Sequence, residues 1–434
     1  MKMKFQIALN KFGYLSLLTI VAASPFAINR VYERPTISQN AFLHLSIMSV
    51  VMIYFPLWFL FGMKKLKLSR PSFYILLYLL AIVVSSLFSP RPDFCFYEMI
   101  FIVPFILFYF CFLSLGLKDR DIVKFLLFLA IMTLPIVIYA VMQNYDVDIL
   151  GYEKAAMRGK KKIASFFGNP NFLASYLAPL FFLTIGLAFR TRGWMLRLFC
   201  VILCLLNLFC LMLSGTRAAW LGIMVASVVC LLLSIKCGMF RAKYIRQIPK
   251  FFAVLIVILV LLFLLPSINF PFEIKERISS TYELLNRLFM WQMGKDVFMD
   301  HPLFGVGYHR YHVVVNSYAY GFFSQNSHQD IFGYALKKGK LQNYLHNDYF
   351  EILVETGIIG LVLFLSILIS TIREKARLCM SDQVTKPQKA FNVFLIGAVF
   401  VFIIDAFWGF PLQLPCSGIL FWTILAVINN RVYV

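Results

Sequence analysis

Residues 194–236 read WMLRLFCVILCLLNLFCLMLSGTRAAWLGIMVASVVCLLLSIK, and this stretch decides the fold class. Two apolar runs, 194–213 and 218–235, are separated by a short polar break that carries Arg217. Each run has about 20 residues, the length at which an α-helix spans a hydrocarbon core of about 30 Å. A helix also keeps its backbone hydrogen bonds internal, as lipid requires. The stretch therefore predicts two transmembrane helices with almost no loop between them.

The same pattern runs through the whole chain of 434 residues, which is 61% hydrophobic and only 14% charged. Because about half of the residues of a soluble domain are apolar, water is not the main solvent of this protein. The sequence lacks the short alternating segments that are typical of a membrane β-barrel. We therefore predict an all-α polytopic membrane protein with about 12 transmembrane helices, at 12–29, 41–62, 72–88, 94–116, 122–143, 172–189, 194–213, 218–235, 251–266, 349–370, 391–405 and 410–428.

The formal net charge of +21 can indicate a nucleic-acid partner, so the placement of Lys and Arg along the chain decides its meaning. Outside the long loops, most basic residues lie in alternate connections, such as KKLKLSR at 64–70 and the stretch from Lys236 to Lys250. The short connections of the opposite set hold only Arg30, Arg34, Arg91 and Arg217. The positive-inside rule therefore predicts cytoplasmic termini and places the long loops 144–171 and 267–348 outside. The charge is mostly a topology signal, and we expect no nucleic-acid partner.

Nothing in the sequence predicts a metal or another cofactor. The nine Cys residues lie mostly in apolar spans, and no CxxC pair is present. Cys200, Cys204 and Cys210 fall in one predicted helix, where we expect them to be packing residues. His309 and His312 are close enough in sequence to suggest a metal, but no Asp or Glu completes a ligand set by spacing. We expect no metal site.

The chain divides into three parts. Residues 1–266 form a bundle of nine transmembrane helices, 267–348 form a large outer loop, and 349–434 contain the last three helices and the C-terminus. Within the loop, 273–302 reads as an amphipathic helix with the apolar stripe Ile274, Ile278, Tyr282, Leu285, Phe289 and Met293. This stripe lies either in the lipid headgroup region or against neighbouring spans, and the sequence leaves both open. On an ideal helix Arg287 falls on the opposite face.

Arg217 and His346 are candidates for chemistry. Arg at the rim of a helix bundle is costly without an anionic partner, although an Arg can also snorkel from a helix end. His346 lies where the outer loop meets the tenth span, and a neutral imidazole with a pKa near 6.5 can accept a proton at physiological pH. Arg287 is a third candidate, because two guanidinium groups suit a pyrophosphate. On charge alone, Arg277 and Arg310 are as good as Arg287.

Other signals have two interpretations. Asn169 and Asn171, at the mouth of the sixth span, either bind sugar hydroxyls or cap a helix. MRGKKK at 157–162 either attracts lipid phosphates or is a solvated loop. Gly357 and Gly360 are expected to permit close helix packing rather than to touch substrate.

Five segments, in chain order, carry a resemblance to a known family. In HNDYFEILVETGIIG (346–360), nine residues separate His346-Asn347 from Gly357, and Gly360 follows after two more. The other four segments are GNPNFLASYL (168–177), SGTRAAW (214–220), NRLFMW (286–291) and HPLFGVG (301–307). Together they resemble the O-antigen ligase family of bacterial envelope glycosyltransferases. The resemblance covers roughly residues 165 to 365, and the first five spans match only in hydrophobic character.

The resemblance implies a GT-C-like, multi-pass enzyme of the bacterial inner membrane, with its large periplasmic loop over the active site. Such enzymes take a polysaccharide from undecaprenyl pyrophosphate and attach it to the lipid A-core oligosaccharide. They invert the configuration at the anomeric carbon of the transferred sugar and use no metal. The catalytic residues of the family would correspond to Arg217, Arg287 and His346. Residues expected to bind the donor or the acceptor are Asn347, Asn169, Asn171 and Arg277.

Alternative functions remain open at this point. O-antigen or capsule polymerases and protein O-oligosaccharyltransferases share the donor and much of the architecture, and they differ in the acceptor. The spacing of the 346–360 segment favours the ligase. About 12 spans are also common in transporters and lipid flippases. A transporter is expected to carry ionisable residues within its helices, and we expect the spans, apart from Glu98, to be nearly free of them.

Overall fold

The computed structural model describes residues 2–29, 35–60, 68–151, 163–239, 281–325 and 344–430. Every regular element in these ranges is helical, which confirms the all-α prediction for the described part of the chain. The elements are α1 (Lys2–Ala23), η1 (Ser24–Phe26), α2 (Pro35–Leu60), α3 (Arg70–Leu87), α4 (Pro92–Glu98), η2 (Met99–Phe101), α5 (Val103–Ser114), α6 (Asp119–Ile131), α7 (Thr133–Asn144), η3 (Ser165–Phe167), α9 (Pro170–Arg190), α10 (Trp194–Ser214), α11 (Arg217–Lys236), α15 (Thr281–Asp300), α16 (Tyr311–Gln325), α18 (Asp348–Met380), α19 (Lys386–Trp408) and α20 (Pro415–Asn429).

Nine helical segments in the described ranges are long and apolar enough to cross a membrane, or ten if α4 and α5 form one bent span. The apolar helix α20 is shorter, with 15 residues. These segments overlap the predicted spans, except that the span predicted at 251–266 lies outside the described residues. The chain is therefore a multi-pass membrane protein.

Two of the predicted spans are interrupted. The span predicted at 94–116 is divided into α4, η2 and α5, with a bend of 44°. Pro104 stands in the first turn of α5, where its missing N–H favours a break from the preceding turn. The span predicted at 122–143 consists of α6 and α7, and Pro135 lies in the first turn of α7. Periodicity alone located both spans but did not show these breaks.

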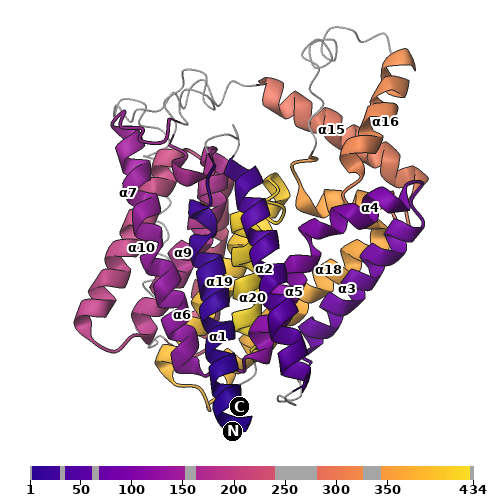
Figure 1. The fold of residues 1–434 in the computed structure, drawn as a ribbon. Helices are drawn as coiled ribbons and strands as arrows, with labels where there is room; N and C mark the ends of the chain where they lie inside the picture. Colours follow the sequence, from indigo (N-terminus) through magenta and orange to yellow (C-terminus); the bar gives the residue numbers. More distant parts are fainter. Residues whose placement is uncertain are drawn as a thin grey trace.

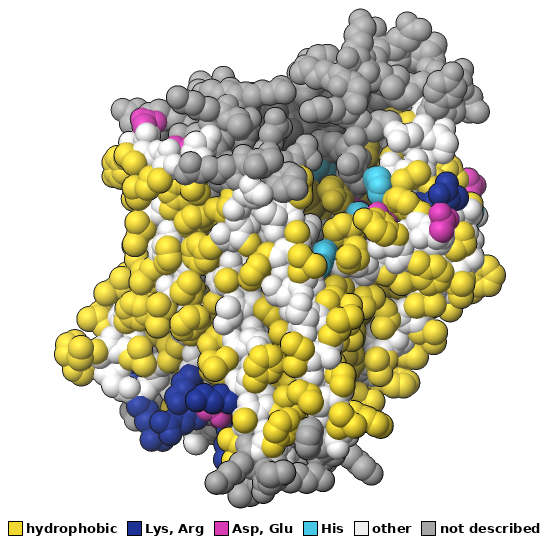
Figure 2. Space-filling model, viewed as in Figure 1, with side chains coloured by type: hydrophobic (Ala, Val, Ile, Leu, Met, Phe, Trp, Pro, Cys, Tyr) yellow, Lys and Arg dark blue, Asp and Glu magenta, His cyan; other side chains and the backbone are white. Residues whose placement is uncertain are grey.

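The two ends of the bundle differ. The first turn of α1 and the last turn of α20 lie at the same end (Figure 1). The opposite end, called the far end below, is formed by the first turns of α9, α11 and α18 and the last turn of α19, and it also carries α15 and α16. Apolar side chains cover much of the face between the two ends that is seen in Figure 2, as expected for a surface that faces lipid.

Helices α9, α19 and α20 form the centre of the bundle. In α9 and α19, 72% of the most apolar stretch is buried, and every residue of α20 is buried. Small residues allow the close approach of their neighbours: a Cβ at Gly397 would lie 2.5 Å from the Cys230 sulfur. All nine Cys residues are free and buried, and Cys200 and Cys210 are fully inaccessible. The prediction that these cysteines are packing residues is confirmed.

The segment 301–307 crosses α18 where that helix is interrupted. Gly357 has φ +67° and ψ −174°, and the helix resumes beyond it. The Pro302 carbonyl accepts a hydrogen bond from the N–H of Ile358 at 3.0 Å. A Cβ at Gly357 would lie 2.0 Å from the Leu303 carbonyl oxygen, so only glycine fits this crossing. Gly357 therefore permits close packing as predicted, although its neighbour is a loop and not another helix.

We expect Gly357→Ala to reduce the yield of folded protein strongly. Its backbone conformation, which only glycine adopts readily, disfavours alanine by about 1–3 kcal/mol, and the collision with a backbone carbonyl adds to this. Gly116→Ala is the matched control, because Gly116 has φ +55° and no atom within 4 Å of an added Cβ. Thermal unfolding of both variants in detergent checks this, and equal losses of Tm would contradict it.

Helices α15 and α16 pack on each other and on the start of α18. Phe289 and Met293 of α15 are buried in a cluster with Val315 of α16 and Val354 of α18. These two residues of the predicted apolar stripe, Phe289 and Met293, therefore pack against neighbouring protein segments. Ile274 and Ile278, at the start of that stripe, lie outside the described residues.

Candidate functional site

Arg217 begins α11 at the far end. α10 ends at Ser214, Gly215 adopts φ +63°, and Thr216 is the N-cap of α11, so only two residues separate the helices. The side chain of Arg217 is exposed, in agreement with its predicted position at the rim. A helix N-terminus also favours anions, because its first N–H groups lack partners within the helix. Arg217 and the start of α11 thus offer positive charge at the same place.

The two asparagines of the sixth predicted span have different positions. Asn169 is the N-cap of α9, and its side-chain oxygen accepts a hydrogen bond from the N–H of Asn171 at 2.8 Å. This confirms the capping interpretation for Asn169. The Asn171 side-chain oxygen contacts the Thr216 hydroxyl at 3.2 Å. The first turns of α9 and α11 are therefore tied together beside Arg217.

The arginines between α11 and α18 also differ. The Nη1 of Arg287, which is half-buried on α15, donates a hydrogen bond to the Trp408 carbonyl at the end of α19, at 2.8 Å. Arg310 donates instead to the Ser89 hydroxyl at 2.7 Å. Arg277 lies outside the described residues. Arg287 thus contacts the end of α19, whereas Arg310 contacts the connection between α3 and α4.

His346 directly precedes α18. Asn347 is the N-cap of this helix, and its side chain accepts a hydrogen bond from the N–H of Phe350 at 3.0 Å. His346 has φ +52°, and its half-buried ring meets the Phe410 ring edge-on, with centroids 5.1 Å apart. Burial, and then the charge of Arg287, lower the pKa of His346 to about 4. The imidazole is therefore neutral at pH 7 and can accept a proton.

The turn Trp408–Phe410 joins these positions. Its Trp408 carbonyl accepts from Arg287, and its Phe410 ring contacts His346. Phe410 also meets the ring of Phe172, the residue after Asn171, at 5.7 Å. Segments of α9, α15 and the start of α18 that carry candidate residues thus meet at one turn. Arg217 is connected to this turn indirectly, through the contact between Thr216 of the α11 N-cap and Asn171 of α9. Sequence reasoning did not single out this turn.

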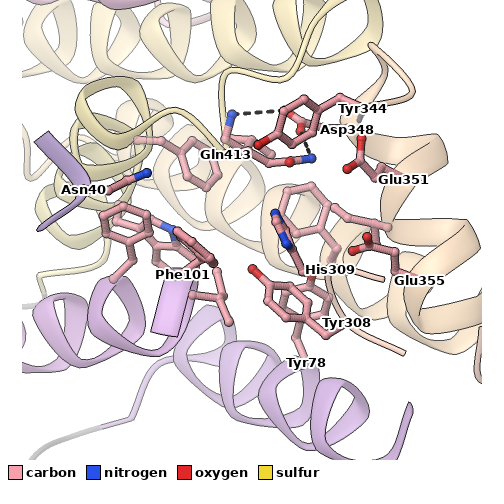
Figure 3. A pocket seen from close by; sticks show the side chains of 17 residues that line it. Asn40, Tyr78, Phe101, Tyr308, His309, Tyr344, Asp348, Glu351, Glu355 and Gln413 are labelled. Carbon is pink, nitrogen blue, oxygen red and sulfur yellow. Dashed lines mark hydrogen bonds between the residues drawn. The ribbon is translucent and has the colours of Figure 1, made fainter. Parts of the chain in front are cut away.

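A cavity of about 80 Å³ lies next to the turn. Tyr344, whose ring stacks on Phe410 at 4.6 Å, is part of its wall. Figure 3 shows that α18 contributes Asp348, Glu351 and Glu355 to this cavity. The spacing of three and four residues places these carboxylates on one helix face. They are 1%, 2% and 5% exposed, so the cavity has a buried acidic wall.

The expectation that the spans are nearly free of ionisable residues apart from Glu98 is wrong. Glu351, Glu355, Lys375 and Asp405 are all buried in α18 or α19. The Asp and Glu spacing in HNDYFEILVE at 346–355 is the signal that could have revealed the acidic face. Ionisable residues within the helices, which a transporter is expected to carry, are therefore present in α18 and α19.

Glu98 belongs to the same polar region. Its Oε2 lies 2.9 Å from Nδ1 of His309, whose ring stacks on Phe101 at 5.1 Å. Burial lowers the pKa of His309, but the hydrogen bond to Glu98 and the charges of Glu355 and Glu98 together more than offset this, so the pKa is raised. The neighbouring His312 ring lies 5.3 Å away. Within the described ranges, no three His, Cys, Asp or Glu side chains are grouped to hold a metal ion.

These observations define a class: a multi-pass helical membrane protein with arginines, a neutral histidine and buried carboxylates at one end of its bundle. Residues 202–365 match the family model described as O-antigen ligase. This segment contains Arg217, Arg287 and His346, and over these residues the resemblance expected from the motifs is confirmed. Members of this family are glycosyltransferase-like enzymes. No curated protein matches the chain at a significant level.

Proposed function

We propose that this protein transfers a polysaccharide from undecaprenyl pyrophosphate to the lipid A-core oligosaccharide, as an O-antigen ligase. The observation that supports this most is the arrangement of Arg287 and His346 around the Trp408–Phe410 turn, with Arg217 next to the Thr216–Asn171 contact that joins α11 to α9. Guanidinium groups offer paired donors to pyrophosphate oxygens, and a neutral imidazole suits an acceptor hydroxyl. The family match supports the same class of reaction.

The proposed location is the bacterial inner membrane, with the far end in the periplasm. Lys and Arg side chains gather at the end of the bundle that carries the first turn of α1 (Figure 2). Arg190, Arg192 and Arg197, around the connection between α9 and α10, and Lys386 and Lys389, in the first turn of α19, belong to this end. The positive-inside rule assigns such an end to the cytoplasm. Both termini would then be cytoplasmic.

In the proposed reaction, the acceptor hydroxyl attacks C1 of the donor sugar from the side opposite the pyrophosphate. The C1–O bond breaks, and its electron pair leaves with the pyrophosphate oxygen. His346 takes the hydroxyl proton, and Arg217 and Arg287 stabilise the charge that grows on the leaving group. The configuration at C1 inverts. The two arginines take the part that a metal ion has in other transferases.

This role of His346 predicts the pH dependence of kcat/KM. The pKa of His346 is lowered, so the base form persists as the pH falls and is lost only near pH 4. In Arg287→Gln the cation beside the ring is removed, so the acidic limb of the profile should move to higher pH, while its height falls. Transfer rates of both proteins between about pH 4 and pH 8 test this. A wild-type limb centred near 6.5, the ordinary pKa, would contradict it.

Deletion of the gene, followed by analysis of the lipopolysaccharide, tests the proposed acceptor. A ligase predicts that long polymer accumulates on the lipid carrier and that lipid A-core lacks it. Core that carries a single repeat unit would indicate a polymerase. Normal lipopolysaccharide together with unglycosylated proteins would indicate a protein O-oligosaccharyltransferase. Complementation with the wild-type gene is the control.

A further inference from the structure

The residue before His346 is held at both of its backbone polar groups. The N–H of Leu345 donates to Oε2 of Glu351 at 3.1 Å, and the Leu345 carbonyl accepts from the indole N–H of Trp291 at 3.0 Å. Leu345 is fully buried and Glu351 is 2% exposed, so water does not replace these partners. A buried backbone group that loses its partner destabilises the fold, because no water molecule takes the partner's place.

The residue after His346 is also fixed, because Asn347 is bound as the N-cap of α18. His346 therefore lies between two anchored residues, in a left-handed conformation of φ +52°. Such a conformation is strained for a residue with a Cβ, and it persists only where the surrounding structure determines it. The contact of Glu351 with Leu345 is one of the bonds that determine it here.

Glu351 is one of three carboxylates that act in this way from one face of α18. Asp348 accepts hydrogen bonds from the N–H of Leu412 at 3.0 Å and from the Gln413 side chain at 3.2 Å, next to the Phe410 ring that His346 contacts. Glu355 accepts from the N–H of Tyr311 at 3.2 Å, at the start of α16. Two of the carboxylates thus hold the surroundings of His346, and the third holds a different segment.

We propose that Glu351 is a positioning residue, which holds the imidazole of His346 beside Arg287 and Phe410 through the backbone of Leu345. This inference rests on the proposed function where it concerns the rate of transfer. It also predicts the environment of the His346 ring, which does not depend on any substrate. Glu351 itself contacts neither the donor nor the acceptor in this account, because its carboxylate is bound to the backbone and buried.

The test compares Glu351→Ala, Glu351→Gln and the matched control Glu355→Ala in the purified full-length protein. Glu351→Ala should lower kcat by about 10²-fold, as a small misplacement of a catalytic group does, with the KM for the donor little changed. Glu351→Gln keeps an acceptor for the Leu345 N–H and should retain most of the activity. Glu355→Ala removes an equivalent buried carboxylate that is bound to another segment, and its effect should not depend on His346.

A double-mutant cycle separates positioning from general stabilisation. In the His346→Ala background, Glu351→Ala should produce no further loss of rate, whereas Glu355→Ala should produce the same fold-change as in the wild type. An equal fold-change for Glu351→Ala with and without His346 would overturn the proposal. If Glu351→Ala does not accumulate, Trp291→Phe removes the other bond to Leu345 and should show the same coupling to His346.

A second readout needs no activity. Histidine NMR titration of the protein without substrate should give a pKa of about 4 for His346 in the wild type and in Glu351→Gln. In Glu351→Ala the released ring should titrate nearer its ordinary pKa of about 6.5. An unchanged pKa in Glu351→Ala would overturn the positioning role. A shifted pKa in a protein that transfers no glycan would instead reject the proposed function alone.

Discussion

Arg217→Ala is expected to lower the rate of glycan transfer by about 10²- to 10³-fold, because the leaving pyrophosphate loses one charge-stabilising donor. The exposed side chain at the start of α11 is placed to reach a substrate from outside the bundle, so the loss should come from the reaction and not from folding. Arg217→Lys should retain part of the rate, since it keeps the charge but not the paired donors. Quantitative transfer assays at matched protein levels measure both variants.

Arg91→Ala is the matched control for Arg217→Ala. Arg91 is also exposed, and it forms a surface ion pair with Asp93 at 2.9 Å in the connection that leads into α4. Surface pairs of this kind contribute about 0–1 kcal/mol, so little change is expected. Full activity of Arg217→Ala, or an equal loss in both variants, would remove Arg217 from the mechanism.

His346→Ala is expected to lower kcat by about 10²- to 10⁴-fold, the usual contribution of a general base. The neutral ring beside Arg287 is the proton acceptor in the proposed reaction, and alanine offers none. Binding of the donor should persist, because the arginines that meet the pyrophosphate remain. Rapid-quench transfer kinetics together with direct binding of the labelled lipid donor separate the two effects.

His301→Ala serves as the comparison for His346→Ala. His301 is exposed in the 301–307 segment, and the pairing of that segment with α18 uses backbone groups. Its removal should therefore leave the rate close to that of the wild type. If His346→Ala kept its kcat and lost only donor affinity, the imidazole would be a binding group and not a base.

Local patterns in the sequence were enough to predict the helical fold and to single out three residues of the candidate site. The length of each apolar run determines whether a helix can span lipid, so the positions of α9, α10 and α11 followed directly. Arg217 stood out because it lies in the short break between two such runs. His346 stood out because it begins the motif in which nine residues separate His346-Asn347 from Gly357. The structure gives the reason for that spacing, since Gly357 is the point at which the 301–307 segment crosses α18.

The contacts that join these parts could not be predicted, because they connect residues far apart in the chain. The bond from Arg287 to Trp408 spans 121 residues, and no periodic pattern records such a pairing. The acidic face of α18 was overlooked for a different reason. Asp348, Glu351 and Glu355 are separated by apolar residues that give the segment the hydropathy of an ordinary span. Their structural role is evident only from the hydrogen bonds that they accept from backbone N–H groups elsewhere in the chain.

Transfer by the purified protein tests the central claim most directly. The protein would be placed in lipid nanodiscs with glycan-loaded undecaprenyl pyrophosphate and lipid A-core, without added metal, and both products would be quantified. We expect one undecaprenyl pyrophosphate to be released for each glycan that becomes attached to lipid A-core. We also expect Arg217→Ala and His346→Ala to lower both signals together by at least about 10²-fold. A donor that remains intact, or whose glycan moves only to the end of another glycan, would contradict the account.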